Sequence, residues 1–182
     1  MSAAQLRLQA AMVLATIALF AAARALNEWL FRPLEFVPGI HFIYLPAGVR
    51  LLCTLLFAEA GAIGLLVVTW LASFLFVFPG QFERPFFGGI LATAAPYAVY
   101  RLACWRYGLR ASLANLTSRR LLVLALACSL AGPLLLHLYF AWRGQPDLLR
   151  GFTAMFIGDL SGTLIVIYGI KALLVLQSGA KP

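Results

Sequence analysis

The stretch AGVRLLCTLLFAEAGAIGLLVVTWLASFLFVF, residues 47–78, is apolar along almost its whole length. As a single α-helix it would be about 48 Å long at about 1.5 Å per residue, whereas the hydrocarbon core of a bilayer is about 30 Å thick. The residues AEAG, 58–61, interrupt the apolar pattern, and Glu59 and Gly61 suit a turn. We therefore expect the stretch to break there into two helices that cross a membrane in opposite directions.

The first of these helices, 47–57, is too short to cross a membrane unaided, since its length is about 16 Å. Pro46 suits its first turn, because the N–H that proline lacks would be unpaired there anyway. Non-helical backbone at membrane depth must be surrounded by protein or a wet cavity. The helix is therefore either completed by non-helical chain before Pro46 or is a half-helix buried in the bundle.

The composition of the chain excludes a soluble domain. Of the 182 residues, 63% are hydrophobic and 11% are charged, against about 45–50% and about 25% in soluble domains. The net charge of +8 does not indicate nucleic-acid binding, because the basic residues lie mainly in connecting loops and form no basic arm. Basic loops in a membrane protein instead record the orientation of insertion.

Four further apolar segments have the length of a membrane-spanning helix. The first is longer than the core of a signal peptide and is followed by more apolar segments, so we expect an uncleaved helix. The chain, 1–182, is thus predicted to be a single all-α integral membrane domain, a bundle of about six transmembrane helices. Their expected bounds are 8–26, 47–57, 61–78, 86–104, 121–142 and 152–176.

The charged loops predict the orientation of this bundle. The loop 105–120 contains Arg106, Arg110, Arg119 and Arg120 and no acidic residue, and the positive-inside rule places such a loop in the cytoplasm. The loops at the opposite end mix arginine with Asp and Glu. With six crossings, the N- and C-termini are then both expected to be cytoplasmic.

Three ionisable residues lie inside the expected helices, at a similar depth. They are Arg50, His137 and Asp159. Such residues normally face the interior of the bundle and pair, and the planar guanidinium of arginine fits a carboxylate, so we predict that Arg50 pairs with Asp159. The pair either only fixes the helix register or also recognises a ligand or ion, while Arg50 can alternatively reach the interface. His137 is either a hydrogen-bonded packing residue or a third member of this site.

Gly158 and Gly162 flank Asp159 in a G-x-x-x-G pattern. Small residues at this spacing allow another backbone to approach a membrane helix closely. The last helix is therefore expected at the centre of the bundle, with its glycine strip packed either within one chain or between two chains.

Two short motifs resemble the membrane-associated sensor (MASE) domain family, type one. They are YLPAGVRLLCTLLF at 44–57 and GDLSGTLIVIYGIKALL at 158–174. The resemblance implies a bacterial inner-membrane sensory module, although Leu45 departs from the family's tryptophan–proline turn. Since no output domain follows Lys171, such a module is expected to signal through a separate partner protein. The residues that carry the resemblance are Pro46, Ala47, Gly48, Gly158, Asp159 and Gly162.

The expected function is therefore that of a stand-alone membrane module that recognises a ligand and has the lipid bilayer and a protein as partners. The alternatives are a small transporter or transporter subunit, and an assembly factor of a larger membrane complex. An enzyme is not expected, because the sequence contains no H-E-x-x-H, Walker or G-x-S-x-G motif. Neither a metal nor another cofactor is predicted, because the three cysteines are far apart and no His/Cys cluster exists.

Overall fold

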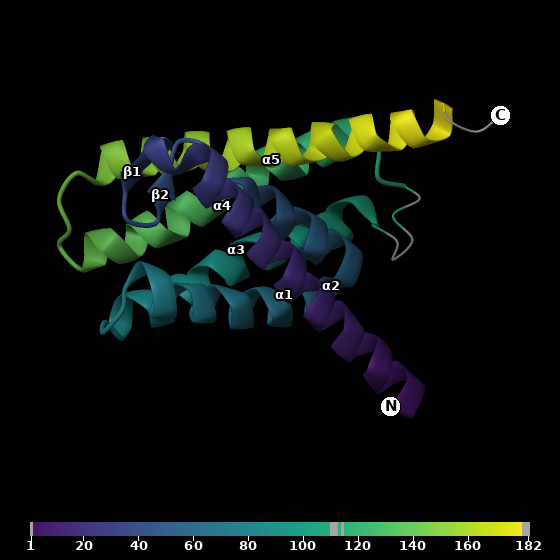
Figure 1. Ribbon diagram of the computed structural model, residues 1–182, viewed down its shortest axis with the longest axis horizontal. Coiled ribbons are helices and arrows are strands. Elements are labelled where there is room, and N and C mark those ends of the chain that lie inside the picture. Colours follow the sequence, from purple (N-terminus) through teal and green to yellow (C-terminus); the bar gives the residue numbers. More distant parts are fainter. Residues whose placement is uncertain (1, 110–112, 114, 180–182) are drawn as a thin grey trace.

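The computed structural model describes residues 2–109, 113 and 115–179, and these residues are almost entirely helical (Figure 1). Five α-helices follow one another along the chain, with a short β-hairpin between the first two. The helices are α1 Ala3–Phe31, α2 Leu45–Ala72, α3 Glu83–Tyr107, α4 Ser118–Trp142 and α5 Leu148–Gly179. The hairpin consists of β1 Glu35–Val37 and β2 Ile40–His41, and two short helical turns are η1 Arg32–Leu34 and the π-helix η2 Ser73–Val77.

Four stretches of the described chain are long and apolar enough to cross a membrane, and the protein is accordingly a multi-pass membrane protein. These stretches are Ala3–Leu34, Leu45–Val77, Ser118–Trp142 and Leu148–Gln177. Helix α3 is not one of them; it is as long as α4 but has arginines near both ends, at Arg84, Arg101 and Arg106. The prediction of an all-α membrane protein is confirmed at this level.

Helix α2 contains the break that the sequence predicts. Ala58 has φ 48° and ψ −118°, which is not helical. A Cβ atom placed on Gly61 would overlap the carbonyl oxygen of Cys53, although residues eight positions apart in a straight helix are about 12 Å apart. The chain therefore folds back at Ala58, and α2 consists of a first arm (45–57) and an antiparallel second arm (59–72).

The predicted helices 8–26, 86–104, 121–142 and 152–176 lie inside longer observed helices, whereas the predicted helix 61–78 ends one residue beyond η2. Helix α1 starts at Ala3, where Ser2 and Gln5 form a reciprocal capping box. It continues to Phe31, whose φ of −124° and ψ of 12° depart from helical values, and the 3-10 turn Arg32–Leu34 follows directly. The hairpin that follows was not predicted from the sequence.

The glycine strip of α5 packs against non-helical chain of the same molecule. A Cβ atom on Gly158 would overlap the carbonyl oxygen of His41, and one on Gly162 would overlap that of Tyr44. The backbone N–H of Tyr44 donates to the carbonyl of Gly158 (3.0 Å), and the hydroxyl of Ser161 donates to the carbonyl of Phe42 (3.0 Å). The close approach is thus intramolecular, and its partner is the extended chain before Pro46 rather than another helix.

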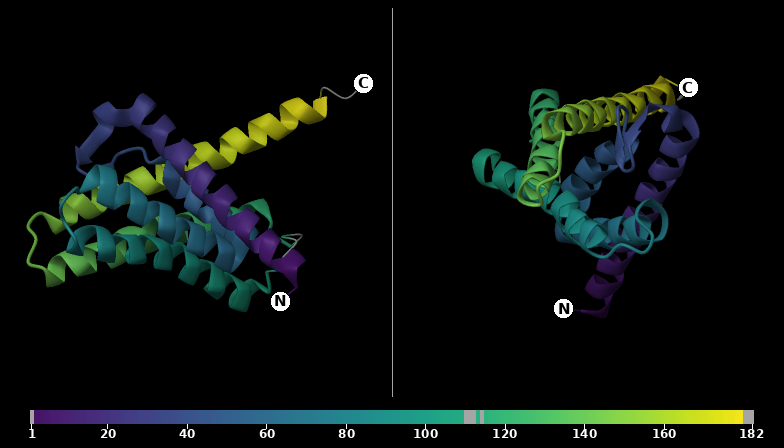
Figure 2. Two further views of the ribbon diagram at one scale, coloured as in Figure 1. Left: turned by 60° about the horizontal axis from the view of Figure 1, so that its bottom comes forward. Right: turned by 90° about the vertical axis from the view of Figure 1, so that its left-hand side faces the viewer.

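The two arms of α2 lie at the centre of the bundle. Helices α1, α3 and α5 pack against α2, and α4 packs between α3 and α5. Both termini lie at one end of the molecule and the hairpin lies at the other (Figures 1 and 2). We call these the terminal end and the hairpin end. The last turns of α5 extend beyond the bundle at the terminal end (Figure 2).

Candidate functional site

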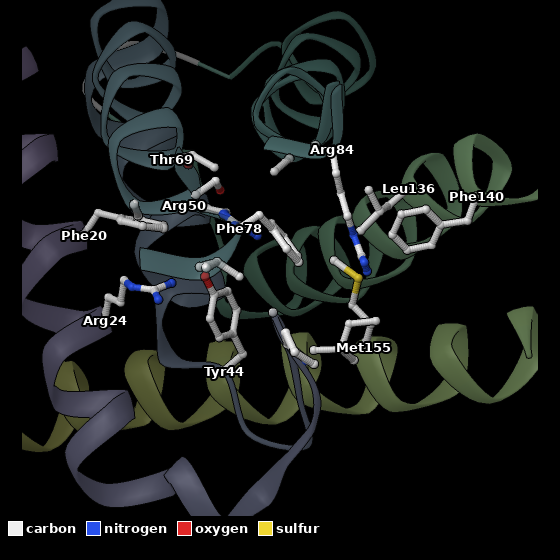
Figure 3. A pocket seen from close by; sticks show the side chains of 18 residues that line it. Phe20, Arg24, Tyr44, Arg50, Thr69, Phe78, Arg84, Leu136, Phe140 and Met155 are labelled. Carbon is white, nitrogen blue, oxygen red and sulfur yellow. The ribbon is translucent and has the colours of Figure 1, made fainter. Parts of the chain in front are cut away.

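A pocket at the hairpin end is lined by side chains from every part of the bundle. Its volume is about 90 Å³, and α1, the hairpin, both arms of α2, η2, α3, α4 and α5 all contribute to its walls. Three of the lining residues are arginines, and no Asp or Glu lies among them (Figure 3). We call it the arginine pocket, and its cations are Arg24 from α1, Arg50 from the first arm of α2 and Arg84 from α3.

Two of these arginines have no carboxylate partner in the part of the chain that the structure describes. Arg24 pairs with Glu28 one turn along α1 (3.6 Å). Arg84 follows Glu83 directly, but the carboxylate of Glu83 pairs with Arg143 on the other side. Neither Arg50 nor Arg84 is in any ion pair between described residues. The guanidinium groups of Arg50 and Arg84 therefore have no carboxylate within 4.0 Å among the described residues.

Aromatic rings hold the two unpaired guanidinium groups. The guanidinium carbon of Arg50 lies 5.5 Å from the ring centroid of Phe20 and 5.2 Å from that of Tyr44. That of Arg84 lies 4.4 Å from the ring of Phe78 and 5.1 Å from a ring contributed by α4, Phe140 (Figure 3). Such contacts fix the orientation of a cation without neutralising its charge. The guanidinium donors thus remain available to an anion.

Local folding places Arg50 in this pocket. The first arm of α2 begins at Leu45, whose backbone N–H donates to the buried side-chain oxygen of Asn27 on α1 (2.8 Å). This bond satisfies one of the free N–H groups that every helix start exposes, and it fixes α2 against α1. Arg50 lies in the second turn after this start. Its Nε atom is buried and has no hydrogen-bond partner among the described residues.

Asp159 lies beside a second, smaller cavity, which we call the polar cavity. Arg50 and Asp159 both line it, together with residues of α2, α3, α4 and α5. Its volume is about 20 Å³, which is room for about one water molecule. The structure therefore brings Arg50 and Asp159 to the same cavity, but it records no ion-pair contact within 4.0 Å between them. The predicted direct pairing stays a prediction.

Two prolines inside helices leave backbone carbonyl groups without hydrogen-bond donors beside the polar cavity. Pro96 in α3 and Pro133 in α4 have no N–H, so the carbonyl groups of Ala92 and Ser129, four residues earlier, lack their usual helical donors. Ala92 and Ser129 both line the polar cavity. The hydroxyl of Ser129 is also buried without a hydrogen-bond partner among the described residues. Polar atoms of α3 and α4 therefore gather close to Asp159.

His137 lies apart from Arg50 and Asp159. It lines neither the arginine pocket nor the polar cavity. Its Nδ1 atom is 2.8 Å from the carbonyl oxygen of Pro133, and its ring contacts the edges of Phe140 and Phe152. Gly151 of α5 leaves room for the imidazole, because a Cβ atom there would be 2.8 Å from Nε2. In this structure His137 is a packing residue between α4 and α5.

His41 in the hairpin is a titratable group of this end that the sequence reasoning did not single out. Its ring stacks on Tyr44 (centroids 5.6 Å apart), and Nε2 lies 3.8 Å from the carboxylate of Glu35. Burial lowers the pKa of His41 below its ordinary value; the carboxylates of Glu35 and Glu28 oppose this shift, and Arg24 adds to it. Since Tyr44 also contacts Arg50, the ring of Tyr44 lies between the hairpin residue His41 and the cation that lines both cavities.

The sequence reasoning also missed the role of Arg24 and Arg84. Both were assigned to loops that record orientation. The sequence does contain a pattern that suits contacts between arginines and aromatic rings. Arg24 follows Phe20 by one helical turn, and Arg84 follows the aromatic residues Phe78 and Phe82 at the start of a helix. All these segments were expected to end at the same face of the membrane.

Comparisons with protein-family models, with curated protein sequences and with solved structures give no match to this chain. The resemblance to the membrane-associated sensor family therefore stays a prediction. Within the structure, the two motifs that carry the resemblance contact each other, since Gly162 lies against Tyr44 and Gly48 lies against Val166 of α5.

Proposed function

We propose that this protein is a membrane-embedded recognition module that binds an anionic group in the arginine pocket. The observation that carries the proposal is the convergence of Arg24, Arg50 and Arg84 on one pocket that no carboxylate lines. Arginine presents a rigid fork of donors that suits phosphate and carboxylate groups. The pocket volume, about 90 Å³, fits a small head group of this kind rather than a large solute.

The proposed topology has six membrane crossings, formed by α1, the two arms of α2, α3, α4 and α5. The first arm is about 20 Å long at about 1.5 Å per residue, and the extended chain 41–44 against α5 completes it. At the terminal end, the described cations Arg101, Arg106, Arg119 and Arg120 outnumber the single acid Glu59. This distribution supports a cytoplasmic terminal end. Arg110 and Lys181, which are also basic residues expected at the cytoplasmic face, lie outside the described residues.

The same topology places the arginine pocket near the opposite face, which in a bacterial inner membrane faces the periplasm. Sensing of a ligand on that side would agree with the resemblance to the sensor family. A protein partner in the membrane or cytoplasm would receive the signal.

Arg50 offers a physical link from the pocket to the interior of the bundle. It lines both the arginine pocket and the polar cavity. An anion in the arginine pocket and the carboxylate of Asp159 would therefore share one guanidinium group. Binding of the anion weakens the hold of Arg50 on Asp159, and α5, which carries Asp159, is the helix that continues to the terminal end. A ligand can shift an equilibrium only through such a difference in contacts.

The proposal is tested with inorganic phosphate and the protein purified in a neutral detergent. An anion that binds the folded state raises the unfolding midpoint as its concentration increases. Arg84→Gln should reduce the apparent affinity for phosphate at least about tenfold, the equivalent of about 1.4 kcal/mol. Arg150→Gln removes the same charge from the same end, outside the pocket, and serves as the matched control. Equal phosphate affinity in the two variants would refute an anion site in this pocket.

A small transporter is the second candidate, and the broken α2 favours it. Transporters bind substrates at interrupted helices whose half-helix starts face the site, and the first arm of α2 starts at the edge of the arginine pocket. Reconstitution into liposomes separates the two functions. Phosphate uptake that Arg84→Gln abolishes would favour transport, whereas phosphate binding without uptake would favour recognition.

A further inference from the structure

We propose that the anionic group recognised by the arginine pocket is the phosphomonoester head group of a membrane lipid, and that the acyl chain of this lipid lies in a lateral groove beside the pocket. The inference rests on the proposed function and names the class of ligand. Three observations carry it: the composition of the groove, its continuity with the pocket and the loose packing of α1.

The lateral groove is a large open cavity between α1, the second arm of α2 and η2, below the hairpin. Its volume is about 800 Å³, within the range of about 300–1,000 Å³ that is usual for sites of small molecules. Its walls change in polarity along α1. Away from the hairpin it is lined by Ile17, Ala21, Val68 and Leu71, whereas the part at the hairpin end is lined by Arg24, Glu28, Arg32, Glu35 and His41.

The lateral groove and the arginine pocket are continuous. Five residues line both, namely Arg24, Pro38, Gly39, Ala72 and Val77. An amphiphile whose apolar part occupies the groove away from the hairpin would thus have its head group beside the three arginines. A water-soluble anion would use the pocket alone and would leave the apolar groove without a role.

The packing of α1 leaves the groove open on the side that lipid would approach. Only Thr16, Phe20 and Asn27 of α1 are buried, and α1 packs mainly on α2. The opposite wall includes the π-helix η2, which contributes Leu75, Phe76 and Val77. Short π-helices occur frequently at functional sites, because the extra residue per turn widens the helix locally.

Charge favours a phosphate head group over a neutral lipid. The pocket contains two guanidinium groups, Arg50 and Arg84, that have no ion pair within the described part of the chain. A phosphate monoester has a charge of about −1.5 to −2 at pH 7, and it accepts several hydrogen bonds from guanidinium donors. Phosphatidic acid is therefore the probe of choice, and phosphatidylcholine, a zwitterionic phosphodiester with the same acyl chains and no net charge, is the comparison.

The test compares one substitution that fills the groove with one that removes the cation. Ala21 is exposed on α1 and lines the groove, so Ala21→Trp should occupy the space of the acyl chain while leaving the pocket intact. Ala22 is also exposed and does not line the groove, so Ala22→Trp is the matched control. The apparent affinities for phosphatidic acid, for phosphatidylcholine and for inorganic phosphate are measured by thermal unfolding in neutral detergent.

The proposal predicts that phosphatidic acid binds at least about tenfold more tightly than inorganic phosphate. Ala21→Trp should lower the affinity for phosphatidic acid at least about tenfold relative to Ala22→Trp and leave the affinity for inorganic phosphate unchanged. Arg84→Gln should lower both affinities. Equal affinity for phosphatidic acid and phosphate, or equal affinity for the two lipids, would overturn the lipid inference. Binding of phosphate that depends on Arg84 would in that case leave the proposed function standing, and binding of neither anion would remove both.

Discussion

At the scale of single residues, the account depends on Arg50. Its guanidinium group lies between the rings of Phe20 and Tyr44, and it lines both the arginine pocket and the cavity beside Asp159. The sequence predicted that Arg50 and Asp159 would meet, since a buried charge in a membrane helix needs a partner. The structure places them at one cavity with room for about one water molecule. This arrangement leaves room for a water-bridged pairing, whereas direct pairing stays a prediction.

A double-mutant cycle tests whether the two groups interact. Arg50→Gln or Asp159→Asn alone should lower the unfolding midpoint, because each leaves the other charge buried without its partner, at a cost of about 3–5 kcal/mol. The double mutant should recover much of this loss, with a coupling energy of about 1 kcal/mol or more. The losses are measured as thermal or denaturant unfolding of the protein in detergent. Strictly additive losses would show that Arg50 and Asp159 do not interact.

The arginine pocket could not be predicted from the sequence in the same way. Arg24, Arg50 and Arg84 are spread over three helices, and nothing in the local sequence indicates that their side chains converge. Arg84 also follows Glu83, the one acidic residue close to it in the sequence. The structure shows that Glu83 pairs with Arg143 instead, which is a tertiary contact and leaves Arg84 free to face the pocket.

At the scale of elements, the break in α2 was predictable because its physical cause is local. A continuous helix over 47–78 would exceed the thickness of a bilayer, and AEAG is the polar interruption in it. The conformation at the break was not predictable. Ala58 adopts a positive φ of 48° with ψ −118°, a region in which a side chain is strained and glycine is not.

This conformation predicts that Ala58→Gly stabilises the protein. Glycine adopts the observed backbone without strain, and the strain relieved is about 1 kcal/mol. The unfolding midpoint in detergent should therefore rise by a few degrees, about 2–4 °C. Ala62→Gly, four residues further along the second arm, is the control and should lower the midpoint, because glycine in a helix interior costs about 1 kcal/mol. A lower midpoint for Ala58→Gly would show that the chain does not reverse at Ala58 with this backbone.

The extended chain before Pro46 was predicted from the sequence as one of two alternatives, whereas the hairpin was not predicted. Non-helical chain before Pro46 was one of two expected solutions for the short first arm, and the structure adopts it, with Tyr44 bonded to Gly158. The strands themselves have three and two residues, too few for an alternating pattern to be recognised in the sequence. Strand β2 is buried and packs against α5, whereas β1 is exposed.

At the scale of the whole molecule, the proposed orientation of the bundle in the membrane is inferred from the distribution of charge alone. Three described arginines, Arg106, Arg119 and Arg120, lie in or beside the connection between α3 and α4 at the terminal end. The hairpin end has both signs of charge, including Glu28, Glu35 and Asp147. The positive-inside rule therefore predicts a cytoplasmic terminal end, as in the proposed topology.

Cysteine labelling tests this orientation in intact spheroplasts. Cys53, Cys104 and Cys128 are first replaced, and a single cysteine is introduced at an exposed position of either end. Ser118→Cys at the terminal end should resist a membrane-impermeant thiol reagent, and Gln145→Cys at the hairpin end should react readily. The reverse pattern would invert the orientation, and labelling of both sites would contradict a cytoplasmic connection between α3 and α4.

The central claim is that the arginine pocket binds an anion, and the most direct measurement is the position of an electron-dense oxyanion in a crystal of the protein. Tungstate has the tetrahedral shape and the charge of a phosphate group, and its anomalous scattering identifies it without ambiguity. We expect one tungstate ion in the arginine pocket, in contact with Arg50 and Arg84, and no tungstate there in Arg84→Gln. Tungstate bound only at surface arginines such as Arg143 and Arg150, with none in the pocket, would contradict the account.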